Sequence, residues 1–432
     1  MDRLEVGSFP LSGLVKGMPN GCDPFPLREV GAKGWNILRE DLPLPAAVLM
    51  ASALEHNERW MAAFLGLADA VIAPHGKTTM SPQLFERQIA HGAWAITVAT
   101  TQQVEVCRRL GLQRILLANQ LVGRQAIRYI LDELERDAGL EFYCLVDSTD
   151  GVASLAQAAR ERELKSPLNL LLEVGHPGGR TGCRDLGAAL AVARAVKAAG
   201  PKFRLRGVEG FEGLIQGTTP TDQEDAIRRF LDLMAQVATA CAKQDLFAPG
   251  TVILSAGGSA FYDLAVERLK RASLGRETMV LTRSGCYLSH DSGLYRRAFA
   301  RLSERSPGLE RLNERPQSAL QLWAYVQSRP EPGKVIMTMG KRDTSGDAGF
   351  PTPELWHRPS DGSGPAPLGP GHAVTDMNDQ HSHMTVPATS PLRVGDMVAF
   401  GISHPCLTFD KWQVLCVVDD RYNVVSAVRT FF

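Results

Sequence analysis

The stretch TVILSAGGSAFYDLAVERLKRASLGRETMVLTR, residues 251–283, contains the unit that decides the fold. An apolar run at Thr251–Ser255 leads into a loop rich in Gly and Ser. A segment with apolar residues at helical spacing follows at Ala260–Ala272, and a second apolar run covers Thr278–Arg283. Short apolar runs that alternate with helical segments are typical of parallel strands joined by helices. The stretch therefore predicts an α/β protein.

The same alternation runs along the chain from residue 70 without a long linker. The expected strands are Ala70–Pro74, Trp94–Ala99, Arg114–Ala118, Glu141–Asp147, Leu168–Val174, Phe203–Phe211, Thr251–Ser255 and Thr278–Arg283. The expected helices are Gln83–His91, Thr101–Leu110, Asp150–Glu163, Leu186–Ala199, Thr221–Lys243 and Ala260–Ala272. Eight such strands are the number in a (β/α)8 barrel of the TIM type. A doubly wound open sheet is the alternative that the pattern leaves open.

The pattern changes after Arg283. A helical segment continues through Ser289–Leu302. The segments expected as β-strands, separated by Gly, Pro, Asp and Ser, are Ala319–Gln327, Gly333–Met339, Met397–Ser403 and Trp412–Ser426. We therefore expect two domains, a barrel over residues 51–285 and a mostly β domain built from residues 1–50 and 286–432. The Gly- and Pro-rich segment Pro359–His372 is expected to be a surface loop.

The composition favours a small-molecule partner. Lys plus Arg and Asp plus Glu both number 47, so the formal charge is zero and no excess of basic residues indicates nucleic acid. No apolar run approaches the roughly 20 residues of a membrane span, and the start MDRLEVGSFP lacks a signal-peptide core. We expect a cytoplasmic protein without membrane association. The eight cysteines contain no C-x-x-C pair, and most are expected to be reduced and buried.

A lysine and several Gly-rich loops are expected at the carboxyl ends of the strands. In VIAPHGKTTM, residues 71–80, Lys77 follows the first strand, where barrel active sites lie, and a poorly solvated lysine can form a Schiff base with pyridoxal phosphate. Ser255, Gly257 and Gly258 follow the seventh strand, and Gly285 and Cys286 follow the eighth, at positions where barrels often bind phosphate. A solvated loop lysine and tight turns without a ligand are the alternatives.

Arg180 lies in HPGGRTG, residues 176–182, after the fifth strand. A guanidinium is permanently charged and only donates hydrogen bonds, so an arginine beside the pyridine nitrogen of pyridoxal phosphate would keep that nitrogen unprotonated. The cofactor would then be a weaker electron sink, which favours reactions that need only a short-lived carbanion. The alternative is an exposed arginine in a glycine-rich turn.

His404 and Cys406 lie in GISHPCLTFDKW, residues 401–412. On an extended segment, residues two apart point to the same face, and an imidazole with a thiolate suits Zn²⁺. Two protein ligands would leave positions for water and substrate. A chance His-x-Cys pair in a core strand is the alternative.

These motifs occur in the order found in one family. H-G-K-T, G-G-R-T-G, the segment GVEGFEG at 207–213, the loop at 255–259 and the H-x-C pair resemble the D-serine dehydratase and D-threonine aldolase group, from about residue 45 to the end. That group consists of pyridoxal-phosphate enzymes with an alanine-racemase-like barrel. The resemblance also implies a homodimer. Phe211 and Leu214 depart from the Tyr and His of the family's Y-E-G-H motif, so the resemblance supports no acid–base role there.

The resemblance also implies roles for individual residues. Lys77 would bind the cofactor covalently and Arg180 would face the pyridine nitrogen. The residues around the phosphate would be Gly257, Gly258, Gly285 and Cys286. His381, in MNDQHSHM, would orient the substrate or the metal-bound group, although a surface loop is also compatible with this stretch.

The expected activity is dehydration and deamination of a β-hydroxy D-amino acid such as D-serine, which gives a keto acid and ammonia. Lys77 or a nearby base would remove the Cα proton, and zinc would help the β-hydroxyl leave. In the family the aldolases carry His-x-Asp, which suits Mn²⁺ or Mg²⁺, and the dehydratases carry His-x-Cys, which selects zinc. The alternatives are retro-aldol cleavage to glycine and an aldehyde, and a non-catalytic pyridoxal-phosphate-binding protein.

Overall fold

The computed structural model describes residues 4–312 and 314–432. The described chain forms two compact units, one of residues 62–77 and 88–285, the other of residues 4–61, 78–87 and 286–432. The division into functional domains at residues 50 and 285 stays a prediction. No helix within the described ranges has the length and apolarity to cross a membrane.

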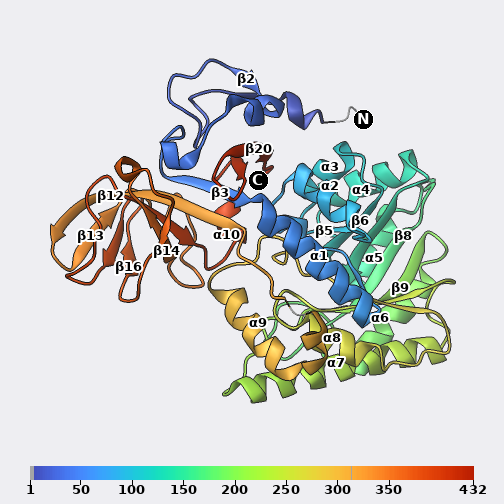
Figure 1. Cartoon of the computed structure of the whole chain (residues 1–432). Helices are drawn as coiled ribbons and strands as arrows, with labels where there is room; N and C mark the ends of the chain where they lie inside the picture. Colours follow the sequence, from blue (N-terminus) through green and yellow to red (C-terminus); the bar gives the residue numbers. More distant parts are fainter. Residues whose placement is uncertain (1–3, 313) are drawn as a thin grey trace. The chain divides into compact units, whose positions relative to one another are not determined.

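The first unit is built on eight parallel strands (Figure 1). They are Val71–Ile72 (β4), Ile96–Val98 (β5), Arg114–Gln120 (β6), Glu141–Val146 (β7), Leu168–Val174 (β8), Phe203–Gly210 (β9), Val252–Ser255 (β10) and Thr278–Thr282 (β11). Their order is β4-β11-β10-β9-β8-β7-β6-β5, and a parallel bridge between His75 and Thr97 joins the two ends. There the Thr97 amide donates to the Pro74 carbonyl at 2.9 Å. The predicted barrel is confirmed, and the open sheet does not form.

Helices alternate with these strands along the chain. They are Ala51–Ala68 (α1), Pro82–Ala90 (α2), Thr101–Arg109 (α3), Arg124–Arg136 (α4), Thr149–Ala158 (α5), Leu186–Ala198 (α6), Pro220–Lys243 (α7) and Tyr262–Leu269 (α8). The expected list lacked α1 and α4. The signal for α4 was present, because Ile127, Ile130, Leu131 and Leu134 are buried at helical spacing. A capping box between Thr219 and Asp222 begins α7.

The apolar side chains of the barrel strands are buried in the core of the first unit. Every residue of β8 is buried, as expected for a parallel strand covered on both faces. Buried side chains from several strands pack in one cluster, which comprises Ala73, Ala95, Leu116, Tyr143, Leu145, Leu171, Ile253 and Leu281. The packed core leaves the strand ends and their loops to carry chemistry.

The second unit is mostly antiparallel β-sheet, as predicted. Its main sheet contains Ala46–Met50 (β3), Leu320–Glu331 (β12), Lys334–Met337 (β13), Thr352–His357 (β14), Ala366–Pro367 (β15), Ala373–Met377 (β16), Ser382–Thr385 (β17), Met397–Gly401 (β18), Val414–Val418 (β19) and Val424–Arg429 (β20). Pro10–Leu11 (β1) and Phe25–Pro26 (β2) pair separately, and Leu294–Arg305 (α9) and Cys406–Phe409 (α10) are its C-terminal helices. Strand β3 pairs with both β12 and β19.

Seven strands of this unit were not expected from the sequence, namely β1, β2, β3, β14, β15, β16 and β17. The expected strand Trp412–Ser426 is two strands, β19 and β20, joined by a turn at Asp419–Tyr422. Most of Pro359–His372 is exposed or half-buried, in agreement with a surface loop, but Ala366–Pro367 adds the short edge strand β15.

Candidate active site

Lys77 lies just beyond the carboxyl end of β4. Gly76–Thr78 forms a single 3-10 turn, and the Lys77 side chain is exposed. Next to it, burial and the positive charges of Lys77, Arg283 and Arg180 hold the pKa of His75 well below its usual value. The His75 ring is therefore neutral, and its Nδ1 atom is buried without a hydrogen-bond partner among the described residues. Three cations thus act on one end of the barrel.

Arg180 projects from the loop after β8. Its guanidinium lies over the Phe211 ring, 5.0 Å from the centroid, in a cation–π contact. Phe211 thus has a positioning contact that needs no hydroxyl, which accounts for a phenylalanine where the resembling family often has tyrosine. Leu214 is exposed and contributes no ionisable group.

The loop after β10 presents backbone amides to an anion. The amides of Gly257 and Gly258 donate to the Glu212 carboxylate, at 3.0 and 2.7 Å. Gly257 has a φ of +90°, and a Cβ atom there would lie 3.0 Å from Cα of Tyr262, so the loop requires glycine. A phosphate group that binds these two amides would have to replace the buried carboxylate of Glu212.

A buried carboxyl–guanidinium contact lies in the same unit. Glu209, at the end of β9, pairs with Arg283, and Arg283 also donates to the Gly210 carbonyl at 2.9 Å. Burial raises the pKa of Glu209 to about 8, and the charges of Glu173 and Glu212 act in the same direction, whereas Arg283 opposes them. The site therefore combines fixed positive charge with a carboxyl group that titrates near neutrality.

These residues fit a phosphorylated aldehyde cofactor. Such a group needs an amine, cationic neighbours and donors that have no other partner. Lys77 supplies the amine, and Arg180 and Arg283 supply positive charge. The Ser255 hydroxyl is buried and has no partner among the described residues. Gly285 is buried and directly follows Ser284, whose hydroxyl donates to that of Ser259 at 3.1 Å.

His404 and Cys406 come together in the second unit, but not on a strand. Strand β18 ends at Gly401, and Pro405 has helical backbone angles, φ −65° and ψ −41°. Cys406 therefore begins α10, and the expected extended geometry was wrong, because Pro405 turns the chain. The turn still brings the imidazole and the thiol close enough for each to shift the pKa of the other.

This contact separates charge between the two side chains. Hydrogen bonds with Cys286 and His404 hold the pKa of Cys406 well below its usual value. The hydrogen bond with Cys406, together with Asp347, raises the pKa of His404 to about 9. The lowered pKa favours the thiolate form of Cys406, which is the form that binds a soft cation.

Asp347 is a functional candidate that the sequence reasoning missed. Its carboxylate lies 2.7 Å from Nδ1 of His404. A histidine that binds a metal usually donates its other ring N–H to a carboxylate, which fixes the ring orientation. The Tyr295 ring lies edge-on to His404, with centroids 6.5 Å apart. The sequence offered no signal for Asp347, because it lies 57 residues from His404.

Cys286 directs its side chain at the same pair. Its Sγ atom lies 3.5 Å from that of Cys406, and the Thr78 hydroxyl lies 3.5 Å from Cys406 and 3.8 Å from Cys286. Cys406 and burial raise the pKa of Cys286 well above its usual value. Thr78 is the covalent neighbour of Lys77, so the chain that carries the lysine continues directly into this cluster.

The donors fit a metal site that has only two protein ligands. Within residues 4–312 and 314–432, no three His, Cys, Asp or Glu side chains are arranged to hold a metal ion. His404 and Cys406, with Asp347 behind the imidazole, nevertheless supply a nitrogen and a thiolate sulphur. The predicted His381 lies in the turn between β16 and β17, where its side chain is exposed, and its role stays a prediction.

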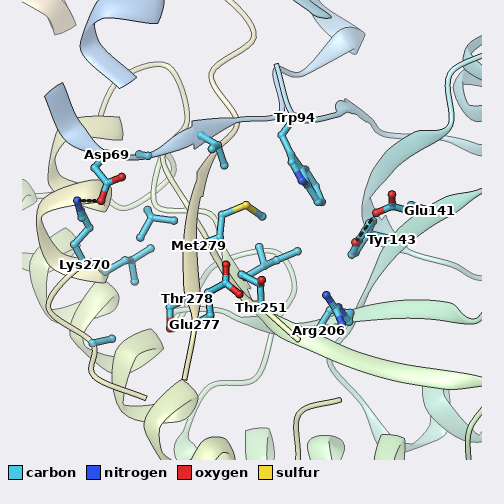
Figure 2. Close-up of a pocket in the computed structure, with 16 residues that line it drawn as sticks. Asp69, Trp94, Glu141, Tyr143, Arg206, Thr251, Lys270, Glu277, Thr278 and Met279 are labelled. Atoms are coloured by element: carbon cyan, nitrogen blue, oxygen red, sulfur yellow. Dashed lines mark hydrogen bonds and ion pairs between the residues drawn. The ribbon is translucent and has the colours of Figure 1, made fainter. Parts of the chain in front are cut away.

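A cavity of about 430 Å³ lies at the opposite, amino ends of the barrel strands (Figure 2). Its wall includes Trp94 and Tyr143. Two of its charged groups are in ion pairs, Lys270 with Asp69 at 2.8 Å and Glu141 with Arg114 at 2.7 Å. It contains none of the predicted site residues. The cavity belongs to the end of the barrel that usually serves stability.

A (β/α)8 barrel with a lysine and cations at its carboxyl end, combined with a β-rich unit, defines a class of pyridoxal-phosphate enzymes. Residues 50–268 match the family described as alanine racemase, N-terminal domain, and this match covers slightly more than half of the chain. The chain belongs to this family. Residues 319–418 match a second family, described as putative serine dehydratase domain.

Individual relatives agree with these matches. A D-threonine aldolase from Arthrobacter sp. is 25% identical over 383 residues, which cover 87% of this chain and 89% of the relative. The crystal structure of D-threonine aldolase from Filomicrobium marinum has a TM-score of 0.72 at 20% identity. The match covers 92% of this chain and 97% of the aldolase chain.

D-threo-3-hydroxyaspartate dehydratase from Delftia sp. HT23 has a TM-score of 0.70 at 20% identity. The match covers 92% of this chain and 99% of the dehydratase chain. A variant of such a dehydratase in a metal-free form has a TM-score of 0.68. The resemblance inferred from the motifs is confirmed, and so is the prediction of a lyase at the level of the family, because aldolases and dehydratases are lyases.

Proposed function

We propose that the protein is a pyridoxal-phosphate- and zinc-dependent dehydratase of a β-hydroxy D-amino acid similar to D-serine, which releases a keto acid and ammonia. The observation that carries this proposal is the His404–Cys406 pair, in which the carboxylate of Asp347 lies 2.7 Å from the imidazole and the pKa of the Cys406 thiol is lowered. Membership of the alanine racemase family supports the organic cofactor. The metal-free form of a related dehydratase supports a metal.

In this proposal the barrel unit binds pyridoxal phosphate. The cofactor supplies an aldehyde that links to an amine and a ring that withdraws electrons from Cα. Lys77 would bind the aldehyde and then move the Cα proton. Arg180 is kept in place by Phe211 and would donate to the ring nitrogen. The phosphate would be met by Ser255 and by the backbone at Gly257, Gly258, Gly285 and Cys286.

His404 and Cys406 would bind zinc through an imidazole nitrogen and a thiolate. Zinc supplies a Lewis acid for the substrate's β-hydroxyl. A thiolate ligand favours zinc over the harder Mn²⁺ and Mg²⁺. Asp347 would keep the His404 ring in one orientation, and Tyr295 would limit ring rotation on its other side. His381 is proposed to orient the substrate.

A second candidate is retro-aldol cleavage to glycine and an aldehyde. The 25% identity to a D-threonine aldolase over most of both chains favours it. The thiolate in the metal pair favours the dehydratase, since a carboxylate at that position would suit the harder metal of an aldolase. A non-catalytic pyridoxal-phosphate-binding protein would have no use for a β-rich unit whose residues 319–418 match a dehydratase domain.

The experiment that tests the proposal measures two products on one sample. The purified protein, supplied with pyridoxal phosphate and zinc, is given D-serine and D-threonine, and keto acid and glycine are quantified. Keto acid should dominate, should disappear after chelation and should return when zinc is restored. Cys406→Asp should raise the ratio of glycine to keto acid when Mn²⁺ is supplied.

The control is Cys416→Ala, which removes a buried thiol from β19 in the same unit. It should leave the product ratio unchanged. A rate and a product ratio that are insensitive both to chelation and to the loss of Cys406 would contradict the metal assignment. The homodimer and the cytoplasmic location remain predictions from the sequence.

A further inference from the structure

Two thiols of the second unit lie close enough to react with each other. The Sγ atoms of Cys286 and Cys406 are 3.5 Å apart, although 120 residues separate them in the chain. Neither Cys286 nor Cys406 is joined in a disulfide in the structure. A disulfide has an S–S length of about 2.05 Å, so the two atoms need to approach by roughly 1.5 Å.

The two thiols differ in accessibility. Cys286 is 3% exposed, whereas Cys406 is half-buried at the first residue of the short helix α10. A small oxidant in solution therefore reaches Cys406 first. The buried Thr78 hydroxyl lies 3.5 Å from the Cys406 sulphur and 3.8 Å from the Cys286 sulphur, so it contacts both atoms.

We propose that Cys286 is a resolving thiol for Cys406, and that the two form a reversible disulfide when a peroxide oxidises the enzyme. Hydrogen peroxide transfers one oxygen atom to the Cys406 sulphur, which becomes a sulfenic acid, and one water is released. The Cys286 sulphur then attacks the Cys406 sulphur, the S–O bond breaks, and the proton of Cys286 leaves with the hydroxide as a second water. One peroxide is reduced for each disulfide formed.

The consequence for the enzyme rests on the proposed function. A Cys406 sulphur bound to Cys286 has no thiolate for zinc, so the oxidised protein cannot hold the metal through this residue. Without a resolving thiol, the sulfenic acid would continue to sulfinic acid, which ordinary thiols do not reverse. Cys286 would thus convert a permanent loss of the metal ligand into a temporary one.

The test uses the full-length protein, stripped of metal with a chelator and treated with hydrogen peroxide. Free thiols are counted after denaturation and peptides are mapped by mass spectrometry. The count should fall from eight to six, with a Cys286–Cys406 cross-linked peptide that dithiothreitol removes. In Cys286→Ala the cross-link should be absent, and Cys406 should accumulate sulfinic acid at least tenfold above wild type.

Cys416→Ala is the matched control and should still form the cross-link, since Cys416 is a buried thiol outside the cluster. Sulfinic acid at Cys406 in the wild type, without a cross-link to Cys286, would overturn the proposal. That result comes from wild-type protein and does not depend on whether a variant folds. Zinc added before peroxide should lower the cross-link yield; an unchanged yield would contradict the metal site while leaving the disulfide supported.

Discussion

At the scale of single residues, the candidate site depends on side chains whose protonation is set by their neighbours. Burial and three cations lower the pKa of His75, Cys286 and His404 lower the pKa of Cys406, and burial raises the pKa of Glu209 to about 8. Perturbed groups of this kind cluster at functional sites. His75 lies in the loop after β4, Glu209 lies near the end of β9, and Cys406 is the first residue of α10.

Lys77→Ala should abolish the covalent link to pyridoxal phosphate, because it removes the amine next to the cations that act on His75. The measurements are the absorbance band of the bound cofactor near the visible edge and a borohydride-reducible adduct. Lys270→Ala is the control, since Lys270 pairs with Asp69 at the amino end of the barrel. A reducible adduct that persists in the Lys77 variant would refute the assignment.

Asp347→Asn should weaken metal binding by roughly 10–100-fold, because the His404 ring loses the carboxylate that orients it. The dissociation constant for zinc is measured by competition with a chromogenic chelator. Asp361→Asn, on the surface beside Arg358, should leave the constant unchanged. Equal affinities for both variants would show that Asp347 does not support the metal site.

The raised pKa of Glu209 should make the free energy of unfolding depend on pH. Its pKa of about 8 in the folded state lies above the ordinary 4.5, so the folded state holds a proton that the unfolded chain loses between these values. The free energy of unfolding should therefore fall as pH rises from about 4.5 to about 8, by up to about 1.4 kcal/mol per pH unit.

Glu209→Gln should flatten this dependence, because the amide does not ionise. Thermal midpoints at about pH 5 and about pH 8 are compared with those of the surface variant Glu267→Gln. The infrared band of a protonated carboxyl group should also be lost in Glu209→Gln near neutral pH. A wild-type midpoint that rises over this range would contradict the raised pKa.

At the scale of secondary-structure elements, the loop between β10 and α8 is the most constrained part of the candidate cofactor site. It turns at Gly257 with a positive φ and presents two amides to the Glu212 carboxylate. The buried carboxylate orders the loop, and a positive φ at this point lets the chain enter α8. The loop should thus tolerate little change in its backbone.

Gly257→Ala should destabilise the protein by about 1–3 kcal/mol and weaken pyridoxal-phosphate binding, because it combines backbone strain with a contact of 3.0 Å to Tyr262. Gly275→Ala is the matched control: its φ is +68°, but a Cβ atom there meets nothing within 4 Å. It should cost about 1 kcal/mol and leave cofactor affinity unchanged. Denaturant unfolding and a cofactor titration measure the two effects.

At the scale of the whole molecule, the β-rich unit depends on both ends of the chain. Its core packs Leu11, Met18 and Ile37 against Trp323 and Val418, among others. Strand β3 fills the place between β12 and β19. Loss of the N-terminal segment would expose two strand edges and an apolar surface, both of which promote aggregation.

A chain that begins at residue 51 should therefore fail to fold its β-rich unit. The expected result is aggregation, or loss of near-ultraviolet circular dichroism from buried aromatic residues such as Trp323. A chain that begins at Leu4 should behave as the full-length protein does, because β3 and the N-terminal core residues are retained. A folded, zinc-binding protein that lacks residues 1–50 would contradict this account.

The sequence by itself determined the elements and the chemistry of individual residues. The apolar runs predicted all eight barrel strands because a strand buried on both faces is a local pattern of side chains. Lys77, Arg180, His404 and Cys406 were selected as candidates because their motifs are short, and their roles stay predictions. Some local patterns were misleading or absent. Pro405 turns the chain where an extended geometry was expected at His404, and β14 and β16 show no regular alternation of buried and exposed residues.

Only the tertiary structure decided which side chains meet. Asp347 reaches His404 across 57 residues, and Cys286 reaches Cys406 across 120. The Glu212 carboxylate lies against the amides of Gly257 and Gly258, and β3 joins strands from the other end of the chain. The physical reason is that periodicity records which face of an element is buried, whereas contacts between distant segments depend on how all the elements pack together.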